Sequence, residues 1–151
     1  MNHQNFLRQH TALLRASYLH WTGEALVAAQ LNDDEAVEVL MSASFAIVTH
    51  DTASDPIFNY ANQRALKLFE MDWAEFTQLP SRLSAETVYQ EKRGAALDEV
   101  SRNGFVQHYS GIRIAKSGRR FWIRDTTIWN LMTPDGKLHG QAARIGATAA
   151  T

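Results

Sequence analysis

The sequence of 151 residues contains no cysteine. Disulfides, thiolate metal sites, cysteine nucleophiles and photochemistry through a cysteine adduct are therefore excluded for this chain. A chain without cysteine suits a reducing compartment, and we expect a cytoplasmic protein. The length is that of one domain, which can bury a sufficient core without cross-links.

A dominant charge and a long apolar run are also lacking. The chain has 15 Lys and Arg against 16 Asp and Glu, for a net charge of −1. No basic stretch is large enough for a nucleic-acid footprint, and no apolar run approaches the roughly 20 residues of a membrane span. The N-terminus also lacks the basic flank and apolar core of a signal peptide. We therefore expect neither a nucleic acid nor a membrane as partner.

Residues 106–145 predict three consecutive antiparallel strands. The segments 106–115, 120–132 and 138–145 are rich in aromatic and β-branched residues, which favour strands. Between them lie Ser117-Gly118 and Pro134-Asp135-Gly136, which have the composition of tight turns. Turn length then sets the register, and the register decides which side chains share a face.

We expect a two-residue loop at Ser117-Gly118 and a three-residue loop at 134–136. One sheet face would then be apolar with a polar patch at its centre; its residues are Ile112, Ile114, Phe121, Ile123 and Trp129, with His108, Ser110, Asp125, Thr127 and Gln141. On the other face, Arg113 would stack beside Trp122. Because buried polar groups need partners, the patch is a candidate pocket unless its members satisfy one another.

The preceding chain predicts mostly helix. Apolar residues at three- and four-residue steps indicate helices over residues 3–30, 61–70 and 85–103, with Arg93 on the water-facing side of the last. Shorter helices follow the caps Asn32 and Asp72. Segments 45–50 and 57–60 read as strands. The apolar stripe of residues 3–30 covers either the outer sheet face or the same helix of a second chain.

This order predicts an α+β fold, with a five-stranded antiparallel sheet, a helical insert on one face and an extra N-terminal helix. We expect three regions. Residues 1–31 form a helical extension for dimerisation or for covering the sheet, residues 32–146 form the domain, and residues 147–151 form a frayed tail.

Several segments, in the same order, resemble the MEKHLA domain, a PAS-like family. They are Leu79–Leu83, Tyr109–Ile114, Lys116–Phe121, Trp129–Leu131 and Gly140–Ala143, while the order of elements with Ile57–Asn62 running into Ala65–Phe69 resembles the PAS fold more generally. The resemblance implies a PAS-like fold and a sensory or interaction module, and it names no ligand. Haem-binding PAS domains take their iron ligand from the helix before the third strand, and residues 85–103 contain no histidine. Adduct-forming flavin domains need a cysteine. We therefore expect no haem, no cysteine-adduct flavin and no metal.

The leading hypothesis is a sensor that binds a small organic molecule of unknown identity between sheet and helices and signals through its N-terminal helix or a homodimer. The predicted ligand-binding residues are Asn59, Arg82, His108, Ser110, Asp125, Thr127, Trp129 and Gln141. Trp129 would stack on the ligand, and Arg82 would pair with either an anionic ligand or a local carboxylate.

Two alternatives stay open. One is a ligand-free protein-interaction module that dimerises. The other is a small α+β barrel enzyme with His108 and Asp125 as an acid–base pair. A nucleophile relay through Ser110 is disfavoured, because residues two apart on a strand lie about 7 Å apart. We predict no catalytic residues for the leading hypothesis.

Overall fold

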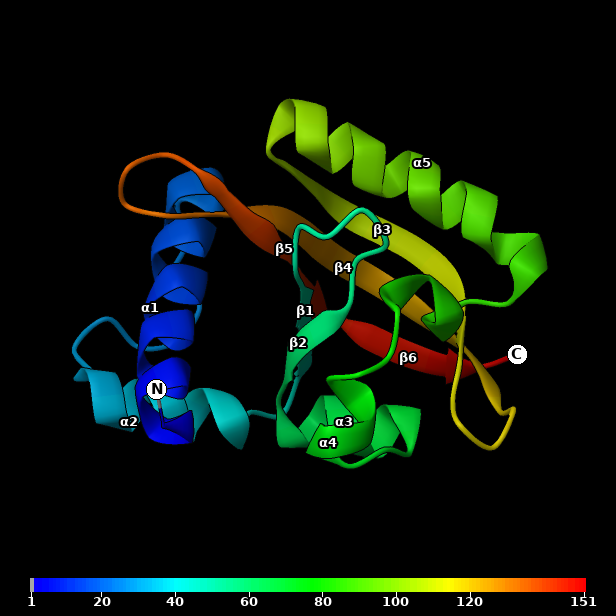
Figure 1. The fold of residues 1–151 in the computed structure, drawn as a ribbon, viewed down its shortest axis with the longest axis horizontal. Helices are drawn as coiled ribbons and strands as arrows, with labels where there is room; N and C mark the ends of the chain where they lie inside the picture. Colours follow the sequence, from blue (N-terminus) through cyan, green and yellow to red (C-terminus); the bar gives the residue numbers. More distant parts are fainter. Residues whose placement is uncertain (1) are drawn as a thin grey trace.

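The helices and strands follow the predicted order in a computed structural model that describes residues 2–151 (Figure 1). The helices are α1 (His3–Thr22), α2 (Asp33–Met41), α3 (Gln63–Phe69), α4 (Trp73–Phe76), the 3₁₀ helix η1 (Ser81–Ser84) and α5 (Thr87–Asn103). The strands are β1 (Ala46–His50), β2 (Phe58–Ala61), β3 (Phe105–Ile114), β4 (Arg120–Met132), β5 (Leu138–Ile145) and β6 (Ala147–Ala150). Helix α1 stops at Gly23, whose φ of 75° favours glycine, so the helix does not continue to residue 30.

One antiparallel sheet contains the five predicted strands in the order β2-β1-β5-β4-β3. The expectation of a frayed tail was wrong for residues 147–150, which form β6 and pair with residues 121–124 of β4. Strand β5 pairs with β4 only from Thr127 onward, so the earlier part of β4 has backbone groups free for β6. The chain passes from β5 to β6 at Gly146, where a Cβ would lie 2.4 Å from the Asp125 carbonyl oxygen.

Helices cover both faces of the sheet (Figure 1). The insert of α3, α4, η1 and α5 covers one face, while α1 and α2 cover the other. The core under α1 and α2 includes Leu7, Leu14, Tyr18, Leu40, Ile47, Tyr60, Trp129 and Leu131. The core on the insert side includes Val48, Phe58, Phe69, Phe76, Phe121, Ile123 and Ile145. The apolar stripe of α1 therefore covers the sheet, which decides between the two possibilities for that helix.

Asn62 joins three elements at the centre of the fold. Its side-chain oxygen accepts hydrogen bonds from the backbone N–H of Ala65, in the first turn of α3, and of Ile47 in β1. Its amide donates to the carbonyl oxygens of Leu40 in α2 and Phe45 just before β1. All four of its hydrogen-bonding capacities are used, and the side chain is fully buried.

The first hairpin differs from the prediction by one residue. Its loop has three residues, 116–118, because the Ala115 N–H donates to the Arg119 carbonyl and Gly118 takes a φ of 91°. Arg113 therefore pairs with Phe121. A slip of one residue turns every side chain of a strand to the other face. Arg113 is buried rather than stacked on Trp122 at the surface, so that expectation was wrong.

The second hairpin has the predicted three-residue loop, since the Thr133 N–H donates to the Lys137 carbonyl. An irregularity between Leu131 and Met132 then shifts the pairing by one residue. Asn130 lies opposite Gln141, and Trp129 lies opposite Ala142. Trp129 and Gln141 consequently face opposite sides of the sheet, contrary to the predicted register.

Candidate functional site

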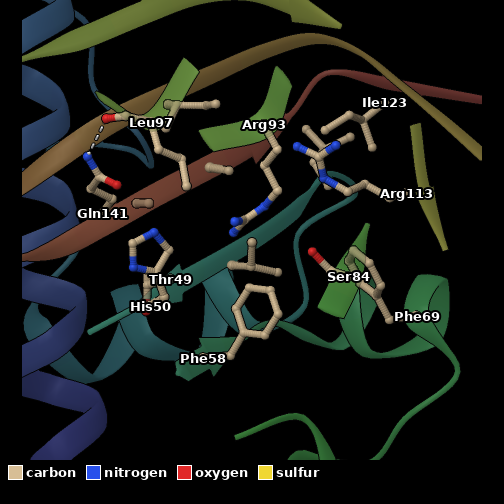
Figure 2. A pocket seen from close by; sticks show the side chains of 15 residues that line it. Thr49, His50, Phe58, Phe69, Ser84, Arg93, Leu97, Arg113, Ile123 and Gln141 are labelled. Atoms are coloured by element: carbon tan, nitrogen blue, oxygen red, sulfur yellow. Dashed lines mark hydrogen bonds between the residues drawn. The ribbon is translucent and has the colours of Figure 1, made fainter. Parts of the chain in front are cut away.

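A cavity of about 50 Å³ lies between the sheet and the helical insert (Figure 2). Its walls come from β1, β2, β3, β4, β5, α3, η1 and α5. Most of the lining is apolar, with Val48, Phe58, Phe69, Leu97, Ile123, Ile128, Ala142, Ala143 and Ile145. The other six lining residues are polar: Arg93, Arg113, His50 and Gln141, together with Thr49 and Ser84.

Arg93 enters the cavity from the middle of α5. The residue is only 9% exposed, and within residues 2–151 its guanidinium forms neither a hydrogen bond nor an ion pair. Burial, with a contribution from the nearby Arg113, lowers the pKa of Arg93 to about 10, so the group stays charged at neutral pH. The expectation that Arg93 faces water was wrong, because it lies one helical turn before Leu97 on the buried side.

Arg113 reaches the same cavity from β3, beside Arg93 (Figure 2). It is 7% exposed. Its guanidinium donates to the Ile112 carbonyl at 2.9 Å and to the Tyr109 hydroxyl at 3.4 Å, and it lies over the Tyr109 ring. Both acceptors are neutral. Two buried guanidinium groups therefore share one cavity, and none of the ion pairs in residues 2–151 includes either of them.

His50 of β1 and Gln141 of β5 also line the cavity. The His50 Nδ1–H donates to the Asp51 carbonyl at 2.9 Å, which leaves Nε2 as a bare acceptor without a partner in the described chain. Burial lowers the pKa of His50, which favours the neutral ring. The Gln141 amide donates toward Leu97, Ser101 and the Asn130 side-chain oxygen.

Gln141 lines the cavity as predicted, whereas the three polar residues of β3 and β4 lie elsewhere. His108, Ser110 and Asp125 are exposed, and His108 Nδ1 lies 2.5 Å from Asp125 Oδ1. Both His108 and Asp125 have positive φ, at 59° and 49°, in the part of the β3–β4 ladder where the register shifts. These irregularities turn the pair outward, so the placement of all three residues in a pocket was wrong.

The other predicted residues also lie outside the cavity. Thr127 and Trp129 are buried on the α1 side, where Trp129 packs edge-on against Tyr18 with ring centroids 4.9 Å apart. Asn59 accepts a hydrogen bond from the Thr49 hydroxyl. Arg82 forms an exposed ion pair with Asp55 at 3.1 Å, which is the local carboxylate alternative.

The enzyme hypothesis required His108 and Asp125 together in a pocket open to solvent. The two side chains do meet, but they are 81% and 67% exposed and do not line the cavity between the sheet and the insert. An acid–base pair on an open surface has no enclosure to orient a substrate or exclude water. The described chain also has no group of three potential metal-ligating side chains.

The sequence matches the model of a protein family over nearly its whole length. The family model for the MEKHLA domain matches residues 8–149, which includes most of α1. The chain belongs to the MEKHLA domain family. The match begins within the segment that we expected to be a separate extension. None of the helices described in this MEKHLA protein is both long and apolar enough to cross a membrane.

Solved structures with similar folds are PAS and light-oxygen-voltage domains. The PAS domain of a protein from Colwellia psychrerythraea is 13% identical, with a TM-score of 0.65 over 78% of this chain and 95% of that one. A light-oxygen-voltage domain studied with a flavin analogue is 19% identical, with a TM-score of 0.61 over 76% and 83%.

An RNA-binding light-oxygen-voltage receptor is also 19% identical, with a TM-score of 0.66 over 84% of this chain and 35% of that receptor. The MEKHLA chain thus spans about a third of that receptor's length. At these identities the comparisons show a PAS-like fold. A search of curated protein sequences gives no match.

Proposed function

We propose that this MEKHLA domain is a sensory module that binds a small organic molecule between the sheet and the helical insert and signals through α1. The observation that carries the proposal is the cavity of about 50 Å³, in which His50 Nε2 has no hydrogen-bond partner and Arg93 has no ion-pair partner within residues 2–151. A cavity needs about 10–15 Å³ to admit one water. The space therefore suits a ligand of about four to six non-hydrogen atoms, and the surrounding fold is the one used by PAS domains.

We propose a ligand smaller than a flavin, although one structural relative was studied with a flavin analogue. Pockets for ligands of that size measure about 300–1,000 Å³, far above the present cavity of about 50 Å³. The chain also has no cysteine for an adduct, and α5 has no histidine for haem iron. We therefore propose a ligand smaller than these cofactors.

A chain of hydrogen bonds supports signalling through α1. The Gln141 amide in the cavity donates to the Asn130 side-chain oxygen at 3.1 Å. The backbone oxygen of Asn130 accepts a hydrogen bond from the Trp21 indole at 3.0 Å, near the end of α1. A ligand that forms a hydrogen bond with Gln141 would weaken the bond from Gln141 to Asn130. It would thereby shift Asn130, which accepts the hydrogen bond from Trp21. A homodimer stays a prediction, and it would need surfaces other than the α1 stripe that covers the sheet.

Filling the cavity with protein atoms should abolish binding without unfolding the chain. Ala143 faces the cavity between Val48 and Ile128, so the Ala143→Leu side chain would occupy the ligand space. The assay is thermal shift and native mass spectrometry with a panel of acids, amides, alcohols and amino acids of up to six non-hydrogen atoms. We expect compounds that raise the Tm of the natural chain to have no effect on Ala143→Leu, whose own Tm should stay within about 4 °C.

The matched control is Ala95→Leu, which adds the same atoms at an exposed position of α5. It should keep the response to every active compound. Binding that survives unchanged in Ala143→Leu would contradict the proposed location, and a panel without any active compound would contradict ligand binding.

The Trp21→Phe variant tests the signalling route. It keeps an aromatic ring against Gly104 but removes the indole N–H that reaches Asn130. We expect an active compound to change amide hydrogen exchange over residues 3–22 in the natural chain. In Trp21→Phe this change should disappear while affinity changes by less than about threefold, since the two sites are coupled but separate. An unaltered exchange response in the variant would argue against this route.

A further inference from the structure

We infer that the cavity takes a small organic carboxylate, whose head group lies between Arg93 and Arg113 and whose short apolar tail lies against Phe58 and Phe69. The inference rests on the proposed ligand-binding function and adds the chemical class of the ligand. It follows from the charge of the cavity, the geometry of the donors and the nature of the walls.

The charge of the cavity is unbalanced. Arg93 and Arg113 are each more than nine-tenths buried, and within residues 2–151 no Asp or Glu forms an ion pair with either. Buried guanidinium groups are normally paired, because an uncompensated buried charge is strongly unfavourable. Here the two positive charges also repel one another. An anion in the cavity would relieve both the missing solvation and the repulsion.

The donors have the geometry of a carboxylate site. A guanidinium is a planar fork of N–H groups that matches the two oxygens of a carboxylate. Arg113 directs two donors to Ile112 and Tyr109, which hold its side chain in place. Arg93 has no such partner and keeps its whole fork available, facing the cavity (Figure 2). Arg113 thus serves as a fixed charge, and Arg93 can form the two-pronged contact.

The remaining walls indicate an organic rather than an inorganic anion. A phosphate presents oxygens in all directions and needs donors on every side. Here Phe58, Phe69 and Val48 form an apolar side, which suits a hydrocarbon tail. The His50 Nε2 is a bare acceptor, which disfavours a further anionic oxygen at that end. With a cavity of about 50 Å³, acids of three or four carbons are the appropriate probes.

The test is a calorimetric titration of the full chain at constant ionic strength with three probes: butyrate, butyramide and inorganic phosphate. Butyramide has nearly the shape of butyrate without its charge. We expect butyrate to bind at least about tenfold more tightly than butyramide, and Arg93→Met to remove that preference. Butyramide affinity should be the same in Arg93→Met and in the natural chain. The control is Arg102→Met, an exposed arginine on the same helix, which should bind butyrate normally.

Stability of the free variant gives an independent readout. Because Arg93 makes no hydrogen bond within residues 2–151, Arg93→Met should melt at or above the Tm of the natural chain, whereas removal of a structural arginine would lower it. Arg113→Met loses two hydrogen bonds and is less suitable for this comparison.

The outcomes separate the two proposals. Equal or tighter binding of butyramide would overturn the carboxylate inference and leave a neutral-ligand sensor standing. Phosphate binding without butyrate binding would overturn the organic tail. Failure of all three probes, together with a panel that shows no active compound, would overturn both the inference and the proposed function.

Discussion

We expect the Asn62→Ala variant to lose about 4 kcal/mol of unfolding free energy. The substitution removes an N-cap, worth about 1 kcal/mol, and three further hydrogen bonds at about 1 kcal/mol each. It also leaves the carbonyl oxygens of Leu40 and Phe45 without their donors in a fully buried site. Urea unfolding followed by circular dichroism measures the loss, and an unchanged m-value would show that the change lies in stability.

Two further variants test whether Asn62 stabilises the fold as a junction that joins α2, β1 and α3, and not only by capping α3. Asn62→Asp keeps the oxygen that accepts from Ile47 and Ala65 but places a carboxylate oxygen against two carbonyl oxygens, so it should be as destabilised as Asn62→Ala. Asn32→Ala removes an exposed N-cap of α2 and should cost about 1 kcal/mol. If Asn62→Ala costs no more than Asn32→Ala, the junction role is wrong.

Local chemistry in the sequence was sufficient for most of the fold. Asn32 with Glu35 forms the expected capping box of α2, and Asp72 caps α4 as predicted. The turn at 134–136 has the predicted length. These features depend on a few neighbouring residues, whose preferences are strong, and the order of elements then follows.

The faces of β3 and β4 could not be obtained in this way. A loop with Gly118 at its end is compatible with both a two- and a three-residue hairpin, and the choice moves Arg113 from the surface to the interior. The irregularity at Leu131 and the positive φ of His108 and Asp125 leave no clear mark in the sequence. Each shifts the alternation that assigns side chains to a face.

The candidate site was missed for a related reason. An arginine on a helix or strand is normally at the surface, so residue type alone was no reason to predict that Arg93 and Arg113 line a binding site. One signal was present, because Arg93, Leu97 and Val100 lie at the i, i+4 and i+7 positions of one helical face. Whether Arg113 of β3 faces the same space depends on the β3–β4 register, which only the folded chain establishes.

The second large effect concerns His10, which packs α1 against the sheet opposite the cavity. Its ring is 2% exposed and lies 2.9 Å from the Thr49 hydroxyl through Nε2, while Nδ1 has no partner in the described chain. Because the Thr49 hydroxyl donates to Asn59, it accepts from His10, and the proton of the neutral ring is on Nε2. Burial, with a smaller contribution from His139, lowers the pKa of His10 to about 4.

This depressed pKa makes the fold sensitive to acid. As the pH falls below the ordinary pKa of 6.5, His10 becomes protonated in the unfolded chain. In the folded chain it becomes protonated only near pH 4. Stability must therefore decrease as the pH falls through that window. Since one pKa unit corresponds to about 1.4 kcal/mol, the loss attributable to His10 reaches about 3 kcal/mol at pH 4, and the lowered pKa of His50 adds to it in the same direction.

Urea unfolding at intervals between pH 7.5 and pH 4 measures this dependence. His10→Gln keeps an amide donor in reach of Thr49 but cannot be protonated, so its stability should fall much less over the same range. His20→Gln, on the exposed side of α1, should retain the full slope of the natural chain. Glutamine does not titrate, so it cannot contribute to the change of unfolding free energy with pH. An equal slope in His10→Gln and the natural chain would therefore show that groups other than His10 cause the acid sensitivity.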